Sequence, residues 1–305
     1  MDRRTFLLMA GACAATPARA QAALRIIPLW PAAAPGAGGP AGPPRTSARG
    51  ALSNIAMPFL EIHTPARPGG ACVLIAAGGG YRQIQMEKEA RPAARWLAAR
   101  GITAFILVYR LPGEGWENGP LAPLQDAQRA LRLVRQQAVR RGRDARRIGV
   151  LGFSAGGHLM GLAATRSALR TYQPVDDADA LPARPEAAAL VYPVITLEPP
   201  YDHTSTRRML IGDHPSAAQS AEWSVDPHVG AHCPPVFLVQ ARDDRISKPQ
   251  NSLIMAEAGQ RAGVPVELHE PTTGGHGFGM GRPGSGSAEW PRWYEGWLRA
   301  QDLLA

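Results

Sequence analysis

The sequence predicts an α/β fold in which a mainly parallel sheet carries helices on both faces. Strand and helix patterns alternate along the chain, and most of the strand candidates are short, largely apolar runs. A strand that is apolar on both sides is typical of a parallel sheet buried between two helical layers. With 305 residues, 45% of them hydrophobic, the chain is long enough to form a full core. No repeat is present, and the even alternation favours one domain.

Six short runs are the candidate strands, and segments with helical spacing separate them. The runs are 71–77, 102–108, 147–153, 187–192, 235–240 and 264–269. The helical segments are 92–100, 121–140, one that begins near 158, 252–262 and one that begins at 290. Pro92 suits the first turn of its helix, and Gly101 suits the position just after its end. Trp290, Trp293 and Trp297 share one face of the last helix, which favours core packing over a sugar-binding platform.

The first residues have the pattern of an export signal. Arg3 and Arg4 precede a short apolar run, and an Ala-x-Ala site follows at 18–20 or 20–22. A charged start, an apolar core and a small-residue exit are typical of such signals, and the run is too short to span a bilayer. We therefore expect residues 1–22 to be a twin-arginine signal peptide and the mature protein to be periplasmic or secreted, with no stable membrane span.

The rest of the chain divides by composition. Residues 23–50 are dense in Pro, Gly and Ala, which predicts an extended N-terminal arm over the surface. Residues 51–305 carry the alternating pattern and form the single domain. Within it, residues 194–232 break the alternation and are the expected place of a substrate loop or cap.

The chain is basic, with a net charge of +8, and almost all of its cations are arginines. Nucleic-acid binding requires such charge to cluster on one face. The densest run, 140–147, falls instead at the end of a predicted helix, where cations complement the helix dipole. We therefore expect no nucleic-acid partner.

Cys72 and Cys233 are the cysteines that follow the predicted signal, and neither belongs to a metal-binding spacing such as Cys-x-x-Cys. We therefore expect no metal site. An oxidising compartment would allow the two cysteines to pair. Cys72, however, falls in a predicted core strand, where a free cysteine packs as a small apolar residue. Both alternatives stay open.

Residues 152–156, Gly-Phe-Ser-Ala-Gly, have the pattern of a nucleophile elbow centred on Ser154. In this motif a sharp turn between a strand and a helix holds the serine hydroxyl exposed. Glycines are needed because side chains there would clash with the crossing backbone. The apolar run before the motif and the helical segment after it supply the required context, so Ser154 is the candidate nucleophile.

A serine nucleophile needs a base and a group that orients that base. His276 lies between glycines directly after the last candidate strand, so its loop can bring an imidazole over the sheet edge. The orienting carboxylate is Asp243 or Asp244, which follow the strand candidate 235–240. The His-Gly-x-x-Asp pattern that commonly ends such strands favours Asp244, which we take as the acid, whereas a match by the Asp-Asp-x-Ile run favours Asp243.

The reaction also needs donors for the negative charge that develops on a substrate oxygen. Glycines 78–80 follow the first candidate strand, where enzymes with a nucleophile elbow place a backbone donor. We predict an oxyanion hole made by the N–H groups of Gly79, Gly80 and Ala155. A dinucleotide site is not indicated, because Gln83 stands where the third glycine of Gly-x-Gly-x-x-Gly is required. We expect no cofactor.

Together these motifs resemble the α/β-hydrolase esterases, in particular the secreted carbohydrate acetylesterases of the acetylxylan-esterase type within the acetylesterase and hormone-sensitive-lipase-like group. The similarity runs from about Ala71 to the C-terminus. The stretches that carry it are Gly-Gly-Gly-Tyr at 78–81, Tyr-Arg-Leu-Pro at 109–112, Pro-Leu-x-Asp-Ala-x-Arg-Ala at 123–130, Gly-Phe-Ser-Ala-Gly-Gly-His at 152–158, Asn-Ser-Leu at 251–253 and Gly-Gly-His-Gly-Phe-Gly at 274–279. The resemblance implies the α/β-hydrolase fold and a triad of Ser154, His276 and one of Asp243 and Asp244.

Two positions depart from the family pattern. Ala77 stands where lipase-like relatives have the histidine of His-Gly-Gly-Gly, although the carbohydrate esterases commonly lack it. Ser247 and Lys248 stand where Val-Pro is usual after the acid. The second departure bears on which aspartate is the acid.

The resemblance implies an exported serine esterase that hydrolyses short-chain acyl esters, acetyl above all, on plant polysaccharides or oligosaccharides through an acyl-enzyme. A small-molecule carboxylesterase and a prolyl-oligopeptidase-like peptidase are the enzymatic alternatives. Such peptidases carry a propeller domain, which the stretch before residue 71 is too short to build. A hydrolase-fold binding protein is the non-enzymatic alternative. Such proteins typically lose the nucleophile or the base, and here both are present.

Overall fold

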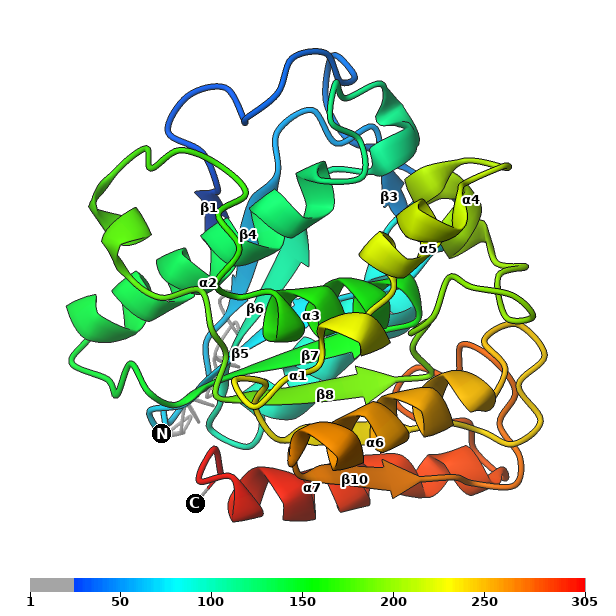
Figure 1. Cartoon of the computed structure of the whole chain (residues 1–305). Helices are drawn as coiled ribbons and strands as arrows, with labels where there is room; N and C mark the ends of the chain where they lie inside the picture. Colours follow the sequence, from blue (N-terminus) through cyan, green and yellow to red (C-terminus); the bar gives the residue numbers. More distant parts are fainter. Residues whose placement is uncertain (1–24, 305) are drawn as a thin grey trace, which may run out of the picture.

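The computed structural model describes residues 25–304, which build an eight-stranded sheet (Figure 1). In spatial order its strands are β1 (Arg25–Pro28), β4 (Phe59–His63), β6 (Thr103–Val108), β5 (Cys72–Ala76), β7 (Ile148–Phe153), β8 (Ala187–Val191), β9 (Val236–Val239) and β10 (Val266–His269). The strands from β6 to β10 in this order run parallel, whereas β4 pairs antiparallel with β6 and β1 antiparallel with β4. The predicted α/β class with a mostly parallel sheet is confirmed. The predicted signal peptide, 1–22, lies outside the described residues.

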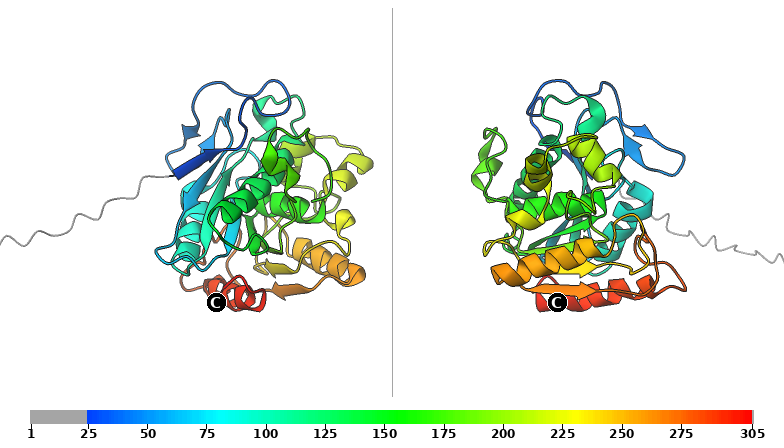
Figure 2. Two further views of the ribbon diagram at one scale, coloured as in Figure 1. Left: turned by 90° about the vertical axis from the view of Figure 1, so that its left-hand side faces the viewer. Right: turned by 45° about the vertical axis from the view of Figure 1, so that its right-hand side comes forward.

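A separate two-stranded ribbon, β2 (Arg45–Thr46) with β3 (Leu52–Ser53), lies apart from the main sheet (Figure 2). The chain also contains a π-helical turn, η1 (Met86–Ala90), directly before the first helix. This turn lies between β5 and that helix in the chain.

Helices cover both faces of the sheet. They are α1 (Arg91–Ala98), α2 (Ala122–Arg140), α3 (Ala155–Thr165), α6 (Gln250–Ala262) and α7 (Trp290–Ala300). α1 and α7 share one face, where Trp96 stacks on Tyr294 and Arg100 pairs with Glu295. The chain crosses the sheet in one direction from β5 to β6 and in the opposite direction from β6 through β7, β8 and β9 to β10. Right-handed crossovers therefore place α2, α3 and α6 on the face opposite to α1. Within residues 25–304, no helix combines the length and hydropathy that a membrane span requires.

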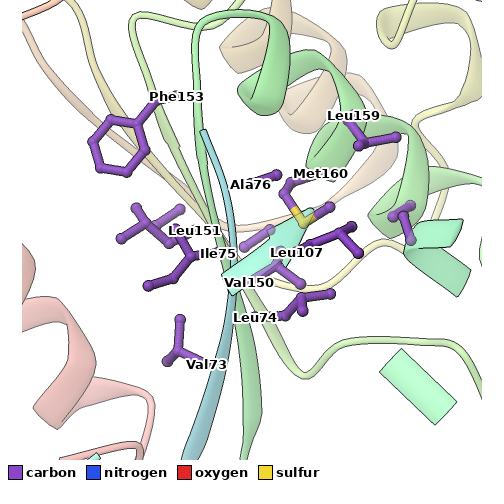
Figure 3. Packing of buried hydrophobic residues seen from close by; sticks show 14 of the residues in the cluster. Val73, Leu74, Ile75, Ala76, Leu107, Val150, Leu151, Phe153, Leu159 and Met160 are labelled. Atoms are coloured by element: carbon purple, nitrogen blue, oxygen red, sulfur yellow. The ribbon is translucent and has the colours of Figure 1, made fainter. Parts of the chain in front are cut away.

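The centre of the core lies on both sides of strands β5 and β7, all of whose residues are buried. Successive side chains point to opposite faces of the sheet (Figure 3). Val73 and Ile75 lie on one side, and Leu74 and Val150 lie on the other, near Met160 of α3. This alternation explains why the strand sequences are apolar at every position.

The tryptophans of α7 pack mainly into the core, as the sequence predicts. Trp290 is fully buried and its ring contacts Phe153, with ring centroids 6.2 Å apart. Trp297 contacts Phe237 of β9 in the same way, at 5.6 Å. Trp293 is partly buried against the same cluster. The prediction of a core helix is confirmed.

The start of the domain differs from the prediction of an arm over 23–50. β1 is an edge strand of the main sheet, and Leu29 and Trp30 are buried in the core. The Trp30 indole N–H donates to Asp126 (2.9 Å), and the Leu29 carbonyl accepts from Arg129 (2.8 Å), both on α2. Four residues are too few to show a periodic pattern, so composition placed this strand in the arm.

β4 was also not among the predicted strands, because Glu61 interrupts its apolar run. Glu61 is buried, and its carboxylate lies 2.9 Å from Arg91 and 2.8 Å from His63. Burial opposes ionisation, but the hydrogen bonds and charges of these two partners lower the pKa of Glu61 to about 2. A paired carboxylate therefore occupies a strand position that a sequence pattern treats as solvent-facing.

Residues 194–232, predicted as a substrate loop or cap, form two short helices, α4 (Ser205–Ile211) and α5 (Ala217–Trp223). Each begins with a side-chain cap, in which Thr204 accepts the Arg207 N–H and Ser216 accepts the Gln219 N–H. The two helices lie beyond the carboxyl ends of the strands (Figure 1). Its part in substrate binding stays a prediction.

Candidate active site

The candidate site lies at the carboxyl edge of the parallel strands. Glycines 78–80 follow β5, Ser154 follows β7, Asp244 lies in the turn after β9, and His276 lies in the loop after β10. Because parallel strands all end at the same edge, residues that are far apart in the sequence meet there. We call residues 78–81 the oxyanion loop and residues 270–279 the histidine loop.

Ser154 occupies the turn between β7 and α3 in a conformation that few non-glycine residues adopt, with φ of 52° and ψ of −117°. The neighbouring glycines are required by close backbone contacts. A Cβ on Gly156 would lie 2.1 Å from the Ala76 carbonyl oxygen, and one on Gly152 would lie 2.3 Å from the Gly156 carbonyl oxygen. Only glycine therefore fits on either side of Ser154, because Gly156 packs against the end of β5 and Gly152 packs against the first turn of α3.

A continuous hydrogen-bonded chain joins Ser154, His276 and Asp244. The Ser154 Oγ lies 2.9 Å from His276 Nε2, and His276 Nδ1 lies 2.8 Å from Asp244 Oδ2. Asp244 is buried, and its Oδ1 accepts the N–H groups of Ile246 (2.8 Å) and Ser247 (3.0 Å). An acceptor-only carboxylate at Nδ1 favours the tautomer whose Nε2 can accept the serine proton.

Asp243, the alternative acid, does not contact His276. Its carboxylate accepts the N–H groups of Gly275 (2.7 Å) and Gly274 (3.4 Å), and these bonds lower the pKa of Asp243 below its usual value. Asp244 therefore contacts the imidazole, and Asp243 contacts the loop that carries it.

The oxyanion loop leaves backbone donors free beside the serine. Gly79 and Gly80 have φ values of 127° and 62°, which only glycine adopts readily. Among residues 25–304, no acceptor takes the N–H groups of Gly79, Gly80 or Ala155. The Gly78 N–H, in contrast, donates to Glu89 (2.6 Å). The three predicted donors are therefore available to a ligand, and their neighbour is not.

Two residues of the site were not among the sequence predictions. Glu89 and Tyr192 are both buried, and the Tyr192 hydroxyl donates to Glu89 (2.9 Å) while the Tyr192 ring contacts His276. Tyr192 follows the end of β8, so the rule that places ligands at strand carboxyl ends could have identified it. Glu89 stands in the polar run Glu-Lys-Glu before a helix, which is typical of a solvated first turn and carries no such signal.

His158 is buried on α3 and links the site to its surroundings. It lies 3.0 Å from the Tyr81 hydroxyl and 2.7 Å from the Trp223 carbonyl oxygen. Burial lowers the pKa of His158 to about 4, although the bond to Trp223 opposes this shift. The neutral ring therefore donates to Trp223 and accepts from Tyr81, so both of its nitrogens have partners.

A cavity of about 510 Å³ opens over Ser154 and His276. Its wall is mostly polar or glycine. The residues that line it are Gly79, Gly80, Arg82, Gln83, Gln85, Lys88, Glu89, Ser154, Val194, Thr204, Ser205, Thr206, Ile246, His276 and Gly277. Val194 and Ile246 are the aliphatic side chains of this lining. Within residues 25–304, no group of three or more His, Cys, Asp or Glu side chains is arranged to hold a metal ion.

The BD-FAE family model matches residues 60–258. This range includes the oxyanion loop, Ser154 and Asp244, and it ends before His276. It covers well over half of the chain.

Individual relatives point in the same direction. An acetylxylan esterase of Xylanibacter ruminicola is 29% identical over 234 residues, which is 75% of this chain and 45% of that protein. An endo-1,4-beta-xylanase B of Butyrivibrio fibrisolvens is 32% identical over 210 residues, which is 68% of this chain and 32% of that protein. The chain therefore spans less than half the length of either relative. Among solved structures, an acetyl ester-xyloside bifunctional hydrolase from Caldicellulosiruptor lactoaceticus matches with a TM-score of 0.76 at 32% identity, covering 92% of this chain and 97% of that one.

Proposed function

The chain belongs to the BD-FAE family of α/β-hydrolases, and from this premise we propose that it is an exported serine carboxylesterase that removes short acyl groups, above all acetyl, from plant polysaccharides or oligosaccharides. The observation that carries the proposal is the hydrogen-bonded chain from Ser154 through His276 to Asp244, beside three free backbone donors.

In the first half of the reaction, Ser154 Oγ forms a bond to the ester carbonyl carbon while His276 Nε2 takes the hydroxyl proton. The carbonyl oxygen becomes an oxyanion that the N–H groups of Gly79, Gly80 and Ala155 stabilise. When the tetrahedral intermediate collapses, the bond to the leaving alcohol breaks and His276 returns the proton to that oxygen. The acyl group remains on Ser154.

In the second half, water replaces the alcohol. His276 takes a proton from the water as its oxygen attacks the acyl carbon, and the second tetrahedral intermediate uses the same donors. Collapse breaks the bond to Ser154, which regains its proton from His276, and the acid leaves. Asp244 keeps the imidazole in the required tautomer and stabilises the imidazolium in both halves.

The cavity supports a hydroxylated leaving group. Thr204, Ser205 and Gln83 offer hydrogen-bonding side chains on its wall, which suits a sugar better than a long alkyl chain. The aliphatic contacts, Val194 and Ile246, are too few to hold more than a short acyl group. The names of the relatives, an acetylxylan esterase and an acetyl ester-xyloside hydrolase, agree with this choice.

The test compares wild type with Ser154→Ala on 4-nitrophenyl acetate, butyrate and octanoate and on acetylated xylo-oligosaccharides. We expect wild type to prefer acetate to octanoate and to release acetate from the oligosaccharides, and Ser154→Ala to lose at least about 1000-fold in kcat. Full turnover by Ser154→Ala would refute the serine mechanism. Cleavage of the aryl esters without release of acetate from the oligosaccharides would refute the carbohydrate substrate and leave the esterase.

Export rests on the twin-arginine pattern and has its own test. In a bacterial host, the wild-type chain is expected in the periplasm, and a double variant Arg3→Lys with Arg4→Lys in the cytoplasm, since twin-arginine export depends on that pair. Equal periplasmic amounts of the two proteins would contradict a twin-arginine signal.

A further inference from the structure

Glu89 is a buried carboxylate in the wall of the catalytic cavity, and the reaction described above gives it no role. It belongs to η1, and only 3% of its surface is exposed. Single π-helical turns are frequent at functional sites. A buried carboxylate costs free energy unless its partners compensate it, so the partners of Glu89 indicate what it does.

The carboxylate joins the oxyanion loop to the histidine loop. Glu89 Oε2 accepts the Gly78 N–H at 2.6 Å, and Oε1 accepts the Tyr192 hydroxyl at 2.9 Å. The Tyr192 oxygen in turn accepts the N–H of Gly279 at 3.1 Å. The Tyr192 ring lies edge to face with the His276 imidazole, with ring centroids 5.0 Å apart. Glu89 therefore contacts the oxyanion loop directly and the histidine loop through Tyr192.

The backbone around η1 touches the same two loops. The Gln85 N–H donates to the Gly78 carbonyl at 3.0 Å, so Gly78 is held through both its N–H and its C=O. On the other side, a Cβ on Gly279 would lie 2.7 Å from the Lys88 carbonyl oxygen. The histidine loop therefore packs directly on the turn that carries Glu89, and Gly279, with φ of 57°, is required there.

Glu89 and His276 line the same cavity, and their charges interact. The titratable groups around it are Lys88, Tyr109, Tyr192 and His276. Burial raises the pKa of Glu89, while its two hydrogen bonds and the charges of His276 and Lys88 oppose the shift. Both of its oxygens accept hydrogen bonds, which is the arrangement of an ionised carboxylate.

We propose that Glu89 is a positioning residue that holds the oxyanion loop and the histidine loop in one arrangement and places a second negative charge, besides that of Asp244, near His276. The inference rests on the proposed esterase function. His276 is neutral before the attack and positively charged in the transition state, so a nearby fixed anion stabilises the transition state more than the ground state. The bond from the Gly78 N–H to Glu89 fixes the residue that directly precedes Gly79, whose N–H is one of the proposed oxyanion donors.

The main test is Glu89→Gln, which keeps the shape of the side chain and removes its charge. We expect kcat/KM for 4-nitrophenyl acetate to fall about 10- to 100-fold, mainly through kcat. The acidic limb of the kcat/KM profile is expected to move to lower pH, because the imidazole loses a neighbouring anion that favours its protonated form. A purely structural role would not move that limb. Activity within about twofold of wild type, or an unmoved limb, would overturn the proposal.

Glu186→Gln is the matched control. Glu186 is a partly buried carboxylate, paired with Arg135 at 3.0 Å, and it lies before β8 at the opposite edge of the sheet. The same substitution there is expected to leave kcat and the pH profile at their wild-type values. Thermal unfolding of both variants sets the assay temperature at which each is folded.

Tyr192→Phe provides a second variant if Glu89→Gln fails to fold. It removes the hydroxyl that links Glu89 to Gly279 and keeps the ring beside His276. We expect kcat to fall about 3- to 10-fold, since one hydrogen bond between the loops is lost, and the acidic limb to stay in place because Glu89 keeps its charge. A wild-type kcat in Tyr192→Phe would overturn the coupling of the two loops.

A fluorophosphonate label separates this inference from the proposed function, because it reacts only with an activated serine. Wild type that does not react at Ser154 would overturn both proposals. Wild type and Glu89→Gln that react at the same rate would overturn the role of Glu89 and leave the esterase. Slower labelling of Glu89→Gln, with Glu186→Gln at the wild-type rate, is the result that supports the inference.

Discussion

At the scale of single residues, Asp243 and Asp244 show how one position in a turn decides a function. The side chain of Asp244 is buried against His276, whereas that of Asp243 is exposed and accepts the N–H groups of Gly274 and Gly275. Successive residues in a turn point in different directions, so a shift of one residue exchanges a partner in the site for one in the loop. The geometry of the turn therefore decides which of the two aspartates contacts His276.

Asp244→Asn is therefore expected to lower kcat by about four orders of magnitude, because an amide at that place favours the wrong imidazole tautomer. Asp243→Asn keeps an oxygen that can accept from Gly275, so its kcat is expected to stay within about tenfold of wild type. Steady-state kinetics of the two single variants on 4-nitrophenyl acetate check this order. A larger loss in Asp243→Asn would contradict the assignment of the acid.

His158 is expected to make stability depend on pH in a defined window. Its pKa falls from 6.5 to about 4 on burial, so the unfolded chain binds the proton more strongly than the folded one. The stabilisation is complete above pH 6.5 and is lost as the pH falls from 6.5 through 4, by about 3 kcal/mol in total. Urea unfolding of wild type and His158→Gln at several pH values checks this.

In His158→Gln the decrease of unfolding free energy between pH 6.5 and 4 is expected to be shallower. Glu61→Gln serves as the control with a separate window. Its lowered pKa stabilises the folded state above pH 4.5, and this contribution disappears as the pH falls from 4.5 toward 2. Parallel curves for wild type and His158→Gln between pH 6.5 and 4 would exclude His158 as the cause.

The sequence was informative about residues whose surroundings are local and uninformative about those whose partners come from elsewhere. Ser154 and His276 were predictable because each sits in a glycine-flanked segment next to a recognisable strand. Glu89 was not, because its meaning depends on Gly78 and Tyr192, which are 11 and 103 residues away along the chain. No spacing rule connects positions that only the folded sheet brings together.

At the scale of elements, the elbow depends on how closely α3 approaches β5. Gly156 lies inside α3, where alanine would normally favour the helix, yet a Cβ there would overlap the Ala76 carbonyl. Gly156→Ala is expected to lower the free energy of unfolding by about 2 kcal/mol or more, as overpacking does, and to lower kcat by displacing Ser154. Chemical unfolding and kinetics of the same preparation measure both effects.

Gly296→Ala is the matched control for this prediction. Gly296 also lies inside a helix, α7, is exposed, and has no atom within 4 Å of the position that a Cβ would take. Here the same substitution is expected to raise the free energy of unfolding by about 0.5–1 kcal/mol and to leave kcat unchanged. Equal effects at the two glycines would show that helix preference, rather than contact with β5, governs Gly156.

The elements that the sequence predicted and those that it missed differ in what surrounds them. β5, β6, β7, β8 and β9 are buried on both faces, so apart from Thr103 of β6 their sequences are apolar. β1 is a four-residue edge strand, and β4 contains the ion-paired Glu61, so neither has a periodic pattern. The π-helical turn η1 is a matter of backbone register and is not visible in composition.

At the scale of the whole molecule, the parallel sheet makes the site possible and the N-terminal strand completes the fold that carries it. Residues 25–35 supply β1, the buried Leu29 and Trp30, and backbone acceptors for α2 and its neighbour. The Leu29 carbonyl accepts from Arg129, and the Pro35 carbonyl accepts from Arg110, whose guanidinium is fully buried against Asp126. These contacts make the segment part of the catalytic domain rather than an arm over it.

Truncation therefore distinguishes the two boundaries. A chain that lacks residues 1–24 keeps all of these contacts and is expected to unfold at the wild-type urea concentration. A chain that lacks residues 1–35 loses β1, Leu29 and Trp30, and it removes one backbone acceptor each from Arg110 and Arg129. It is expected to lose at least about 4 kcal/mol of unfolding free energy, because large buried side chains and buried polar partners are removed together. If the chain that lacks residues 1–35 lost less than about 1 kcal/mol of unfolding free energy, the segment would be a surface arm, and β1 would not contribute to the stability of the domain.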